Sequence, residues 1–193
     1  MENIHVEQMQ RFLRRNASDR FAGHGSFVYG SSNHNQRIES FWGFVRKENA
    51  QFWMNLFQEL KEEDQFTGDF LDKSLIQFCY MKLLQDELNT VAHIWNTHPI
   101  RAQRNRTTPH GRPLIMYTLP HLYGVADHLC PSSRDEILNC EEECLTRRNY
   151  PCDKTVFELC SLLMVERGLH PPGDIDQATH LYITLKEEIW NLL

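Results

Sequence analysis

The stretch "YGSSNHNQRIESFW", residues 29–42, changes character halfway along. Its first half is built from glycine, serine and asparagine, which is typical of a turn. Its second half opens a run in which apolar residues keep helical spacing as far as Leu60, and Asn33 stands three residues before Gln36 as a capping pair. The pattern predicts a helix over roughly 34–62. It also raises a question about Glu39, which is either a solvated helix residue or one member of a metal-binding acidic cluster.

Helical patterns flank this stretch on both sides. Before it, residues 3–15 predict a helix with Val6, Met9 and Leu13 on one face, and "SFVYG", residues 26–30, reads as a short strand ending at Gly30. After it, Asp69 and Asp72 have the spacing of an N-cap and an N3 acid. They predict a helix from Phe70 to about Thr97. Because apolar residues also lie off its main stripe, we expect this helix to be buried on more than one side.

The second half of the chain is less strongly patterned. "PIRAQRNRTTPHGRP", residues 99–113, has the proline and glycine content of an extended basic loop. Beyond it, shorter helices are predicted near 133–146 and 153–167, and a last helix from about Ile175 to Leu193.

Composition excludes several classes of protein. The 193 residues are 41% apolar and 24% charged, which is ordinary for a globular domain. No apolar run approaches the ~20 residues of a membrane span, and the N-terminus lacks the apolar core of a signal peptide, so we expect an intracellular protein. The six cysteines then suit reduced structural thiols, because Cys140, Cys144 and Cys152 lack the spacing of a zinc site.

The charge is unevenly distributed. Pro99 to Ala126 holds four arginines (Arg101, Arg104, Arg106 and Arg112) and no acid, whereas the rest of the chain from Asp127 holds 13 acids against six lysines or arginines. The arginines are either a nucleic-acid contact surface or a solvated loop, and the sequence leaves both open. The aromatic residues Trp42, Trp53 and Phe57 could stack on bases, but their helical spacing predicts core positions. His98, His110 and His121 are scattered, and we assign them no chemistry.

A resemblance extends over residues 2 to about 120. The runs "NQRIESFW", "GDFLDKSLIQFCYMKLLQDELNTVAHIWNTHPIR" and "PHGRPLIMY" resemble integrase core domain-like proteins of the retroviral-type integrase and DDE transposase superfamily. The resemblance implies a mainly α chain, a partial RNase H-like fold lacking the first central strands. Residues 1–120 would be the C-terminal portion of a catalytic core, and residues 121–193 an acidic helical extension. Glu39 matches the third acidic position of the family.

Catalysis in that family depends on three carboxylates that hold two Mg²⁺ ions. Glu2 and Asn3 match the end of the run that carries the second acidic residue, which would therefore precede Met1, and the first would lie further upstream. Asp69 and Asp72 have a sufficient role as helix caps, and Asp19 offers no pairing pattern. We therefore expect Glu39 to be vestigial, no cofactor, and no catalytic activity from this chain.

Two function classes follow. The first is a protein related to DNA integration, acting in the nucleus, inactive as an enzyme and retaining sequence-independent nucleic-acid binding. The second is a helical protein–protein interaction module, in which residues 127–193 contact a protein partner or the chain associates with itself. A truncated gene model, a decayed transposon copy and a domesticated protein all fit the sequence.

Overall fold

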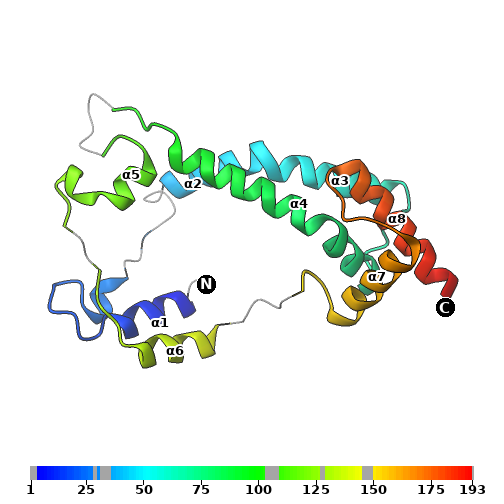
Figure 1. Ribbon diagram of the computed structural model, residues 1–193. Helices are drawn as coiled ribbons and strands as arrows, with labels where there is room; N and C mark the ends of the chain where they lie inside the picture. The colour runs from blue at the N-terminus through cyan, green and yellow to red at the C-terminus, as the bar shows by residue number, and fades with distance from the viewer. Residues whose placement is uncertain are drawn as a thin grey trace. The chain divides into compact units, whose positions relative to one another are not determined.

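The computed structural model describes residues 4–27, 30, 36–102, 109–126, 129–144 and 150–192. Figure 1 shows these parts as helices joined by loops. Within these ranges there is no strand, and the only extended pairing is an isolated antiparallel bridge between Ile100 and Gly111. The mainly α prediction is confirmed, whereas the partial RNase H-like fold stays a prediction. None of the described helices is long and apolar enough to cross a membrane.

The chain folds into two compact units. The first unit combines Met1–Glu39 with Pro99–Arg147, and the second combines Ser40–His98 with Arg148–Leu193. Each unit is therefore assembled from two separate stretches of sequence. The division between residues 1–120 and 121–193 concerns family resemblance, and it stays a prediction.

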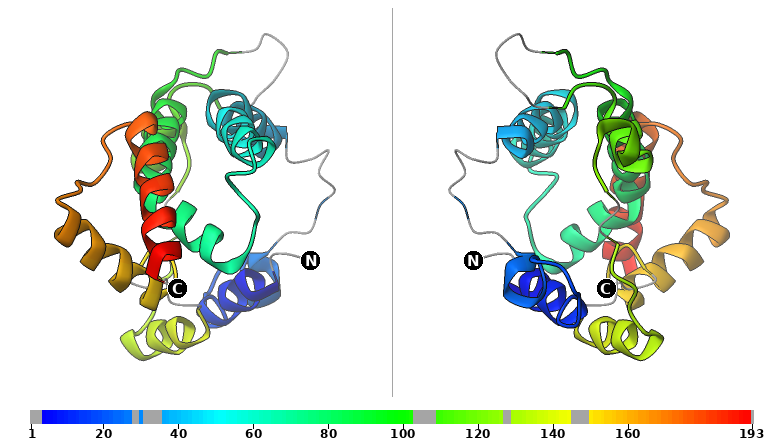
Figure 2. Two further views of the ribbon diagram at one scale, coloured as in Figure 1. Left: turned by 90° about the vertical axis from the view of Figure 1, so that its right-hand side faces the viewer. Right: turned by 90° about the vertical axis from the view of Figure 1, so that its left-hand side faces the viewer.

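The second unit is a helical bundle with a continuous apolar core. Its helices are α3 (Gln51–Glu62), α4 (Phe70–Thr97), α7 (Lys154–Arg167) and α8 (Ile175–Leu192). In Figures 1 and 2, α7 and α8 lie against the first half of α4, and both helices contact it. The core residues come from all four helices: Trp53, Leu60, Leu75, Cys79, Tyr80, Val156, Cys160, Leu163, Met164, Ala178, Leu181, Tyr182, Leu185 and Ile189.

Asp69 and Asp72 begin α4 as the sequence predicts. The Asp69 carboxylate accepts a hydrogen bond of 2.8 Å from the Asp72 backbone N–H, which is the N-cap geometry. The buried Asp72 carboxylate also accepts hydrogen bonds from Thr67, the Tyr182 hydroxyl and Lys186 Nζ, at distances of 2.6–2.9 Å. Burial alone would raise the pKa of Asp72, but the hydrogen bonds from Lys186, Thr67 and Tyr182 together hold it below its ordinary value. This carboxylate therefore attaches α8 to the start of α4.

The predicted helix over 34–62 is observed as one helical path. It consists of α2 (Gln36–Val45), a π-helical turn η3 (Arg46–Ala50) and α3. Glu87 of α4 accepts hydrogen bonds from Asn49 Nδ2 at 2.9 Å and from Trp53 Nε1 at 2.8 Å, so the π-turn is joined to α4. The capping residue Asn33 lies outside the described residues.

The first unit contains shorter helices. They are α1 (Ile4–Leu13), η1 (Gly23–Ser26), α5 (Pro113–Thr118), η4 (Pro120–Tyr123) and α6 (Arg134–Glu143). α1 contacts η1 and α6, and Arg15 forms an ion pair with Glu136 in the capping box of α6. The short strand predicted for residues 26–30 is wrong at its start, because Ser26 ends a 3₁₀ turn. Val28 and Tyr29 lie outside the described residues.

Candidate nucleic-acid interface

The isolated bridge brings Arg101 and Arg112 to one place. The Ile100 N–H donates to the Gly111 carbonyl at 2.8 Å, and the Gly111 N–H donates to the Ile100 carbonyl at 2.9 Å. In this antiparallel register, Arg101 is opposite His110 and Arg112 is opposite Pro99. The bridge therefore brings Arg101, His110 and Arg112, the neighbours of the two paired residues, close to one another, and we call the surface that they form the arginine face. We call residues 99–102 and 109–126 the arginine hairpin.

The hairpin is closed by a glycine that no other residue type would suit. Gly111 has a φ of +125°, and a Cβ there would lie 2.5 Å from the Tyr123 hydroxyl oxygen. Tyr123 at the end of η4 thus lies directly against the bridge. Pro113 at the first turn of α5 and Gly124 in the left-handed region after η4 suit their positions. The geometry of the arginine face is therefore set locally, within the hairpin.

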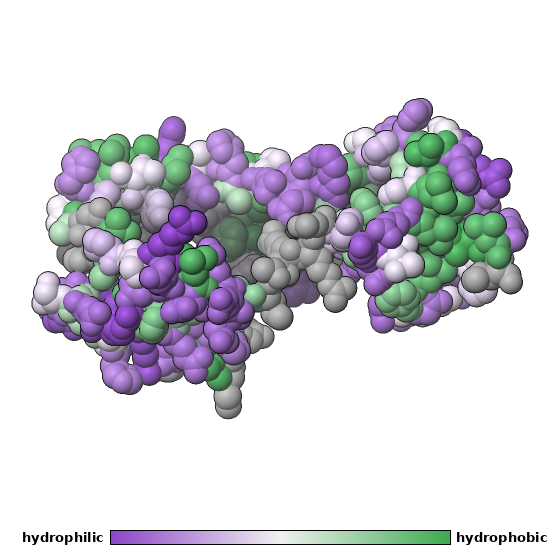
Figure 3. Space-filling view, turned by 60° about the horizontal axis from the view of Figure 1, so that its bottom comes forward, coloured by the Kyte–Doolittle hydropathy of each residue, from purple (hydrophilic) through white to green (hydrophobic). Residues whose placement is uncertain are grey.

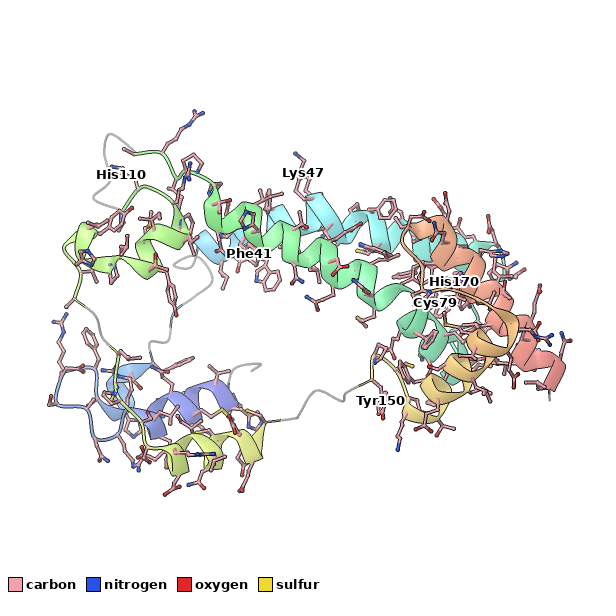
Figure 4. All side chains as sticks on the ribbon, viewed as in Figure 1. Phe41, Lys47, Cys79, His110, Tyr150 and His170 are labelled. Atoms are coloured by element: carbon pink, nitrogen blue, oxygen red, sulfur yellow. The ribbon has the colours of Figure 1, made fainter. Side chains whose placement is uncertain are left out.

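The arginines of this face are available to a ligand. Arg101, His110 and Arg112 are all exposed, and the hairpin contains no aspartate or glutamate. The ion pairs found among the described residues involve neither Arg101 nor Arg112. In Figure 4, His110 is labelled on this loop. A guanidinium without a carboxylate partner suits a phosphate, because its donors match phosphate oxygens. Arg104 and Arg106 lie outside the described residues.

Glu39 lies in the first turn of α2, and its side chain is exposed. This position near the start of a helix agrees with the sequence. The residues present do not fit a two-Mg²⁺ centre, because nowhere in the described part of the chain do three or more His, Cys, Asp or Glu side chains come together as metal ligands would. Asp69 and Asp72 cap α4, and Asp19 forms an ion pair with Arg14 at 2.6 Å.

The aromatic stripe divides between core and surface. Trp53 is 3% exposed and Phe57 packs against the core, as predicted. The prediction is wrong for Trp42, which is 58% exposed, and Ile38 one turn earlier is 44% exposed. Phe41, labelled in Figure 4, packs its ring against Trp42 and against Trp95 at centroid distances of 5.5 and 5.2 Å. Helical spacing shows which residues share a face, but not whether another element covers it.

Sequence reasoning missed two residues of the hairpin. His110 received no chemistry, because its place opposite Arg101 depends on the bridge. Tyr117 is the most exposed of the large apolar or aromatic side chains in the described part of the chain, at 86%, and it lies in α5, a helix that the sequence did not predict. The signal available in the sequence was that Tyr117 is an aromatic residue within residues 99–126, a stretch that contains no acid.

The buried cysteines suit a structural role. Cys79, Cys152 and Cys160 are buried in the second unit and are free thiols. Burial, with a smaller contribution from Cys152, raises the pKa of Cys160 to about 12. Such a thiol stays protonated at neutral pH and is therefore a poor nucleophile and a poor metal ligand.

Comparison with known proteins gives a family match. The family described as "Integrase core domain" matches residues 1–117, which is more than half of the 193-residue chain. Neither the curated proteins nor the solved structures contain a match. The family match covers α1 to α4, most of α5 and the whole Ile100–Gly111 bridge.

Proposed function

This chain belongs to the integrase core domain family, and from that premise we propose that it is an integrase- or transposase-derived protein that binds nucleic acid without reading its sequence. The arginine hairpin is the proposed contact surface. The nucleus is the compartment in which such a protein would meet DNA.

One observation carries the proposal. Arg101 and Arg112, two exposed arginines without ion-pair partners among the described residues, each lie next to a residue of the Ile100–Gly111 bridge in an acid-free stretch. Arg104 and Arg106 belong to the same stretch of sequence between the paired residues. Contacts from these side chains to phosphates would position the chain on nucleic acid but would not specify a base sequence.

We further propose that the chain binds without cleaving. Phosphodiester transfer in this family requires metal-held carboxylates, and Glu39 matches one of the three positions. Its exposed position, with no cluster of metal ligands in the described part of the chain, supports a vestigial role. No Mg²⁺ is expected to bind to this chain at Glu39.

The direct test is a comparison of affinities for a mixed-sequence DNA duplex at low salt. We expect the parent chain to bind and the variant with Arg101, Arg104, Arg106 and Arg112 changed to alanine to bind much more weakly. A matched control changes four exposed lysines of the second unit, Lys47, Lys61, Lys73 and Lys154, to alanine. The control removes the same charge but leaves the hairpin intact. Equal losses in both variants would mean that net charge, and not the hairpin, governs binding.

A second candidate function is protein–protein interaction through the C-terminal helices. Leu162 and Val165 lie about one turn apart on α7 and are 55% and 81% exposed, and Trp190 of α8 is 57% exposed. Figure 3 shows hydrophobic residues gathered on the surface of the part that holds α7 and α8. Exposed apolar surface of this kind favours association. This function would be favoured over the first by two results together. The parent chain would bind no DNA at low salt but would self-associate, and the double variant Leu162→Ser and Val165→Ser would no longer self-associate.

A further inference from the structure

We propose that the arginine hairpin takes single-stranded nucleic acid, with Tyr117 as the surface on which an unpaired base stacks. This inference rests on the proposed function and names its ligand class. It depends on one feature that phosphate contacts do not explain, the almost complete exposure of an aromatic ring beside the arginine face.

Tyr117 projects from the outer side of α5. Its exposure of 86% compares with 44% for Leu114, one turn earlier on the same side of the helix. The residues between them, Ile115 and Met116, are half-buried. Within the described residues, no aromatic neighbour packs on the Tyr117 ring, so both of its faces are open to a ligand.

Tyr117 is close to Arg112 along the chain. Arg112 is the residue that immediately precedes α5, and Tyr117 follows five residues later. At the helical rise this separation is about 8 Å along the axis. This separation is short compared with the length of a strand of several nucleotides, so one single strand can contact both side chains.

The backbone that carries the ring is also held in position. The bridge at Ile100–Gly111 and the packing of Tyr123 on Gly111 close the hairpin on both sides of α5. A backbone that is already ordered loses little conformational freedom when a ligand binds. This arrangement is what a stacking platform requires.

Chemistry favours a single strand over the other possible occupants. In a duplex the faces of the bases are already stacked on one another, so an exposed ring gains nothing from them. In a single strand every base offers a free face, which makes stacking tolerant of sequence, and alanine substitution of such a ring removes about 1–3 kcal/mol per base. A protein partner would need an acidic surface here, because this stretch of sequence holds four arginines and no acid.

The experiment compares three substitutions of Tyr117 on the full chain. Fluorescence anisotropy would measure the affinity for a labelled single strand of about 12 nucleotides, a common site size for such proteins, and for the duplex of the same sequence. We expect Tyr117→Ala to weaken single-strand binding by at least about fivefold while duplex affinity changes less than about twofold. Tyr117→Phe should keep the parent affinity, because it keeps the ring, and Tyr117→Leu should behave like alanine.

The outcomes separate this inference from the proposed function. If Tyr117→Ala left the binding of both probes and its salt dependence unchanged, the stacking role would be overturned. The phosphate-contact surface would then still stand. Restoration of affinity by Tyr117→Leu would overturn the stacking role as well, because an apolar contact would then suffice. Absence of binding to either probe by the parent chain would overturn the proposed function itself. Because Tyr117 is exposed, helical circular dichroism should be the same in all variants, which shows that the fold is retained.

Discussion

At the scale of single residues, Gly111 determines whether the arginine face exists. The sequence shows a glycine in a loop rich in arginine and proline, but it does not show that this glycine pairs with Ile100 or lies against Tyr123. The contact with Tyr123 depends on η4, whose residues follow only after α5. The four arginines were therefore predictable from composition, whereas the face that Arg101 and Arg112 share was not.

The change Gly111→Ala should open the hairpin. A Cβ at this position would meet the Tyr123 hydroxyl at 2.5 Å, and the φ of +125° is strained for alanine, at a cost of about 1–3 kcal/mol. We expect faster hydrogen exchange at the Ile100 and Gly111 amides and weaker DNA binding, with no change in net charge. Gly43→Ala is the control, because a Cβ there meets no atom within 4 Å. Unchanged exchange and affinity in Gly111→Ala would contradict the role of the bridge.

The change Glu39→Gln should have little effect. The side chain is exposed, and surface substitutions of this kind alter the free energy of unfolding by about 0.5 kcal/mol or less. With Mg²⁺ or Mn²⁺, neither the parent nor the variant should nick plasmid DNA, as measured by gel electrophoresis. Metal-dependent nicking that disappears in Glu39→Gln would show that other acids complete a catalytic site.

At the scale of secondary structure elements, the sequence predicted best where a helix has local start and stop signals. α4 begins and ends at the predicted residues, because Asp69 caps it and Pro99 follows its last turn. The sequence did not predict the π-turn at 46–50, and the hydrogen bond that joins its Asn49 to Glu87 spans 38 residues, so local patterning could not show it either. Trp42 was assigned to the core because helical periodicity carries no information about what covers a face.

The attachment of α8 to α4 through Asp72 should depend on pH. The pKa of Asp72 in the folded chain lies below its ordinary value of 3.8, so the carboxylate stabilises the fold above that value and loses its contribution as pH falls through the folded pKa. We expect Asp72→Asn to lower the free energy of unfolding at neutral pH by about 3 kcal/mol, because it leaves Lys186 without its buried partner. Urea unfolding at several pH values would show the difference from the parent shrinking as pH falls below the ordinary pKa of 3.8.

The control for this series is Asp86→Asn. Asp86 forms a comparable ion pair with Lys82 at 2.6 Å, but both side chains are exposed, so its loss should change stability by about 1 kcal/mol or less. A constant difference between the parent and Asp72→Asn across the acid range would mean that Asp72 contributes by its shape and not by its charge.

At the scale of the whole molecule, the region outside the family match completes a core that begins inside it. Trp53, Leu75 and Tyr80 lie within the matched residues, whereas Leu163 and Leu185 lie beyond residue 117, yet all five belong to one cluster. The sequence predicted α7 and α8 as helices, but their packing on α4 joins segments that lie far apart in the chain. Patterning within each segment could not show that contact.

Removal of residues 148–193 should therefore unfold the second unit. Leu75, Cys79 and Tyr80 are 1% exposed or less in the full chain, and loss of α7 and α8 would uncover them. We expect the shortened chain to lose cooperative thermal unfolding and to bind a hydrophobic dye. A cooperative transition in the shortened chain, with the full helical signal of α3 and α4, would show that these helices form a core of their own.

The most direct test of the central claim, that the arginine hairpin binds nucleic acid through phosphates, is the salt dependence of duplex DNA affinity. Each neutralised phosphate on duplex DNA contributes about −0.9 to the slope of log affinity against log salt, so four arginine contacts predict a slope of about −3.6 for the parent chain. The chain with Arg101, Arg104, Arg106 and Arg112 replaced by alanine should give a slope near zero, and the four-lysine control should keep the parent slope. A quadruple arginine variant with the affinity and the slope of the parent would contradict the account.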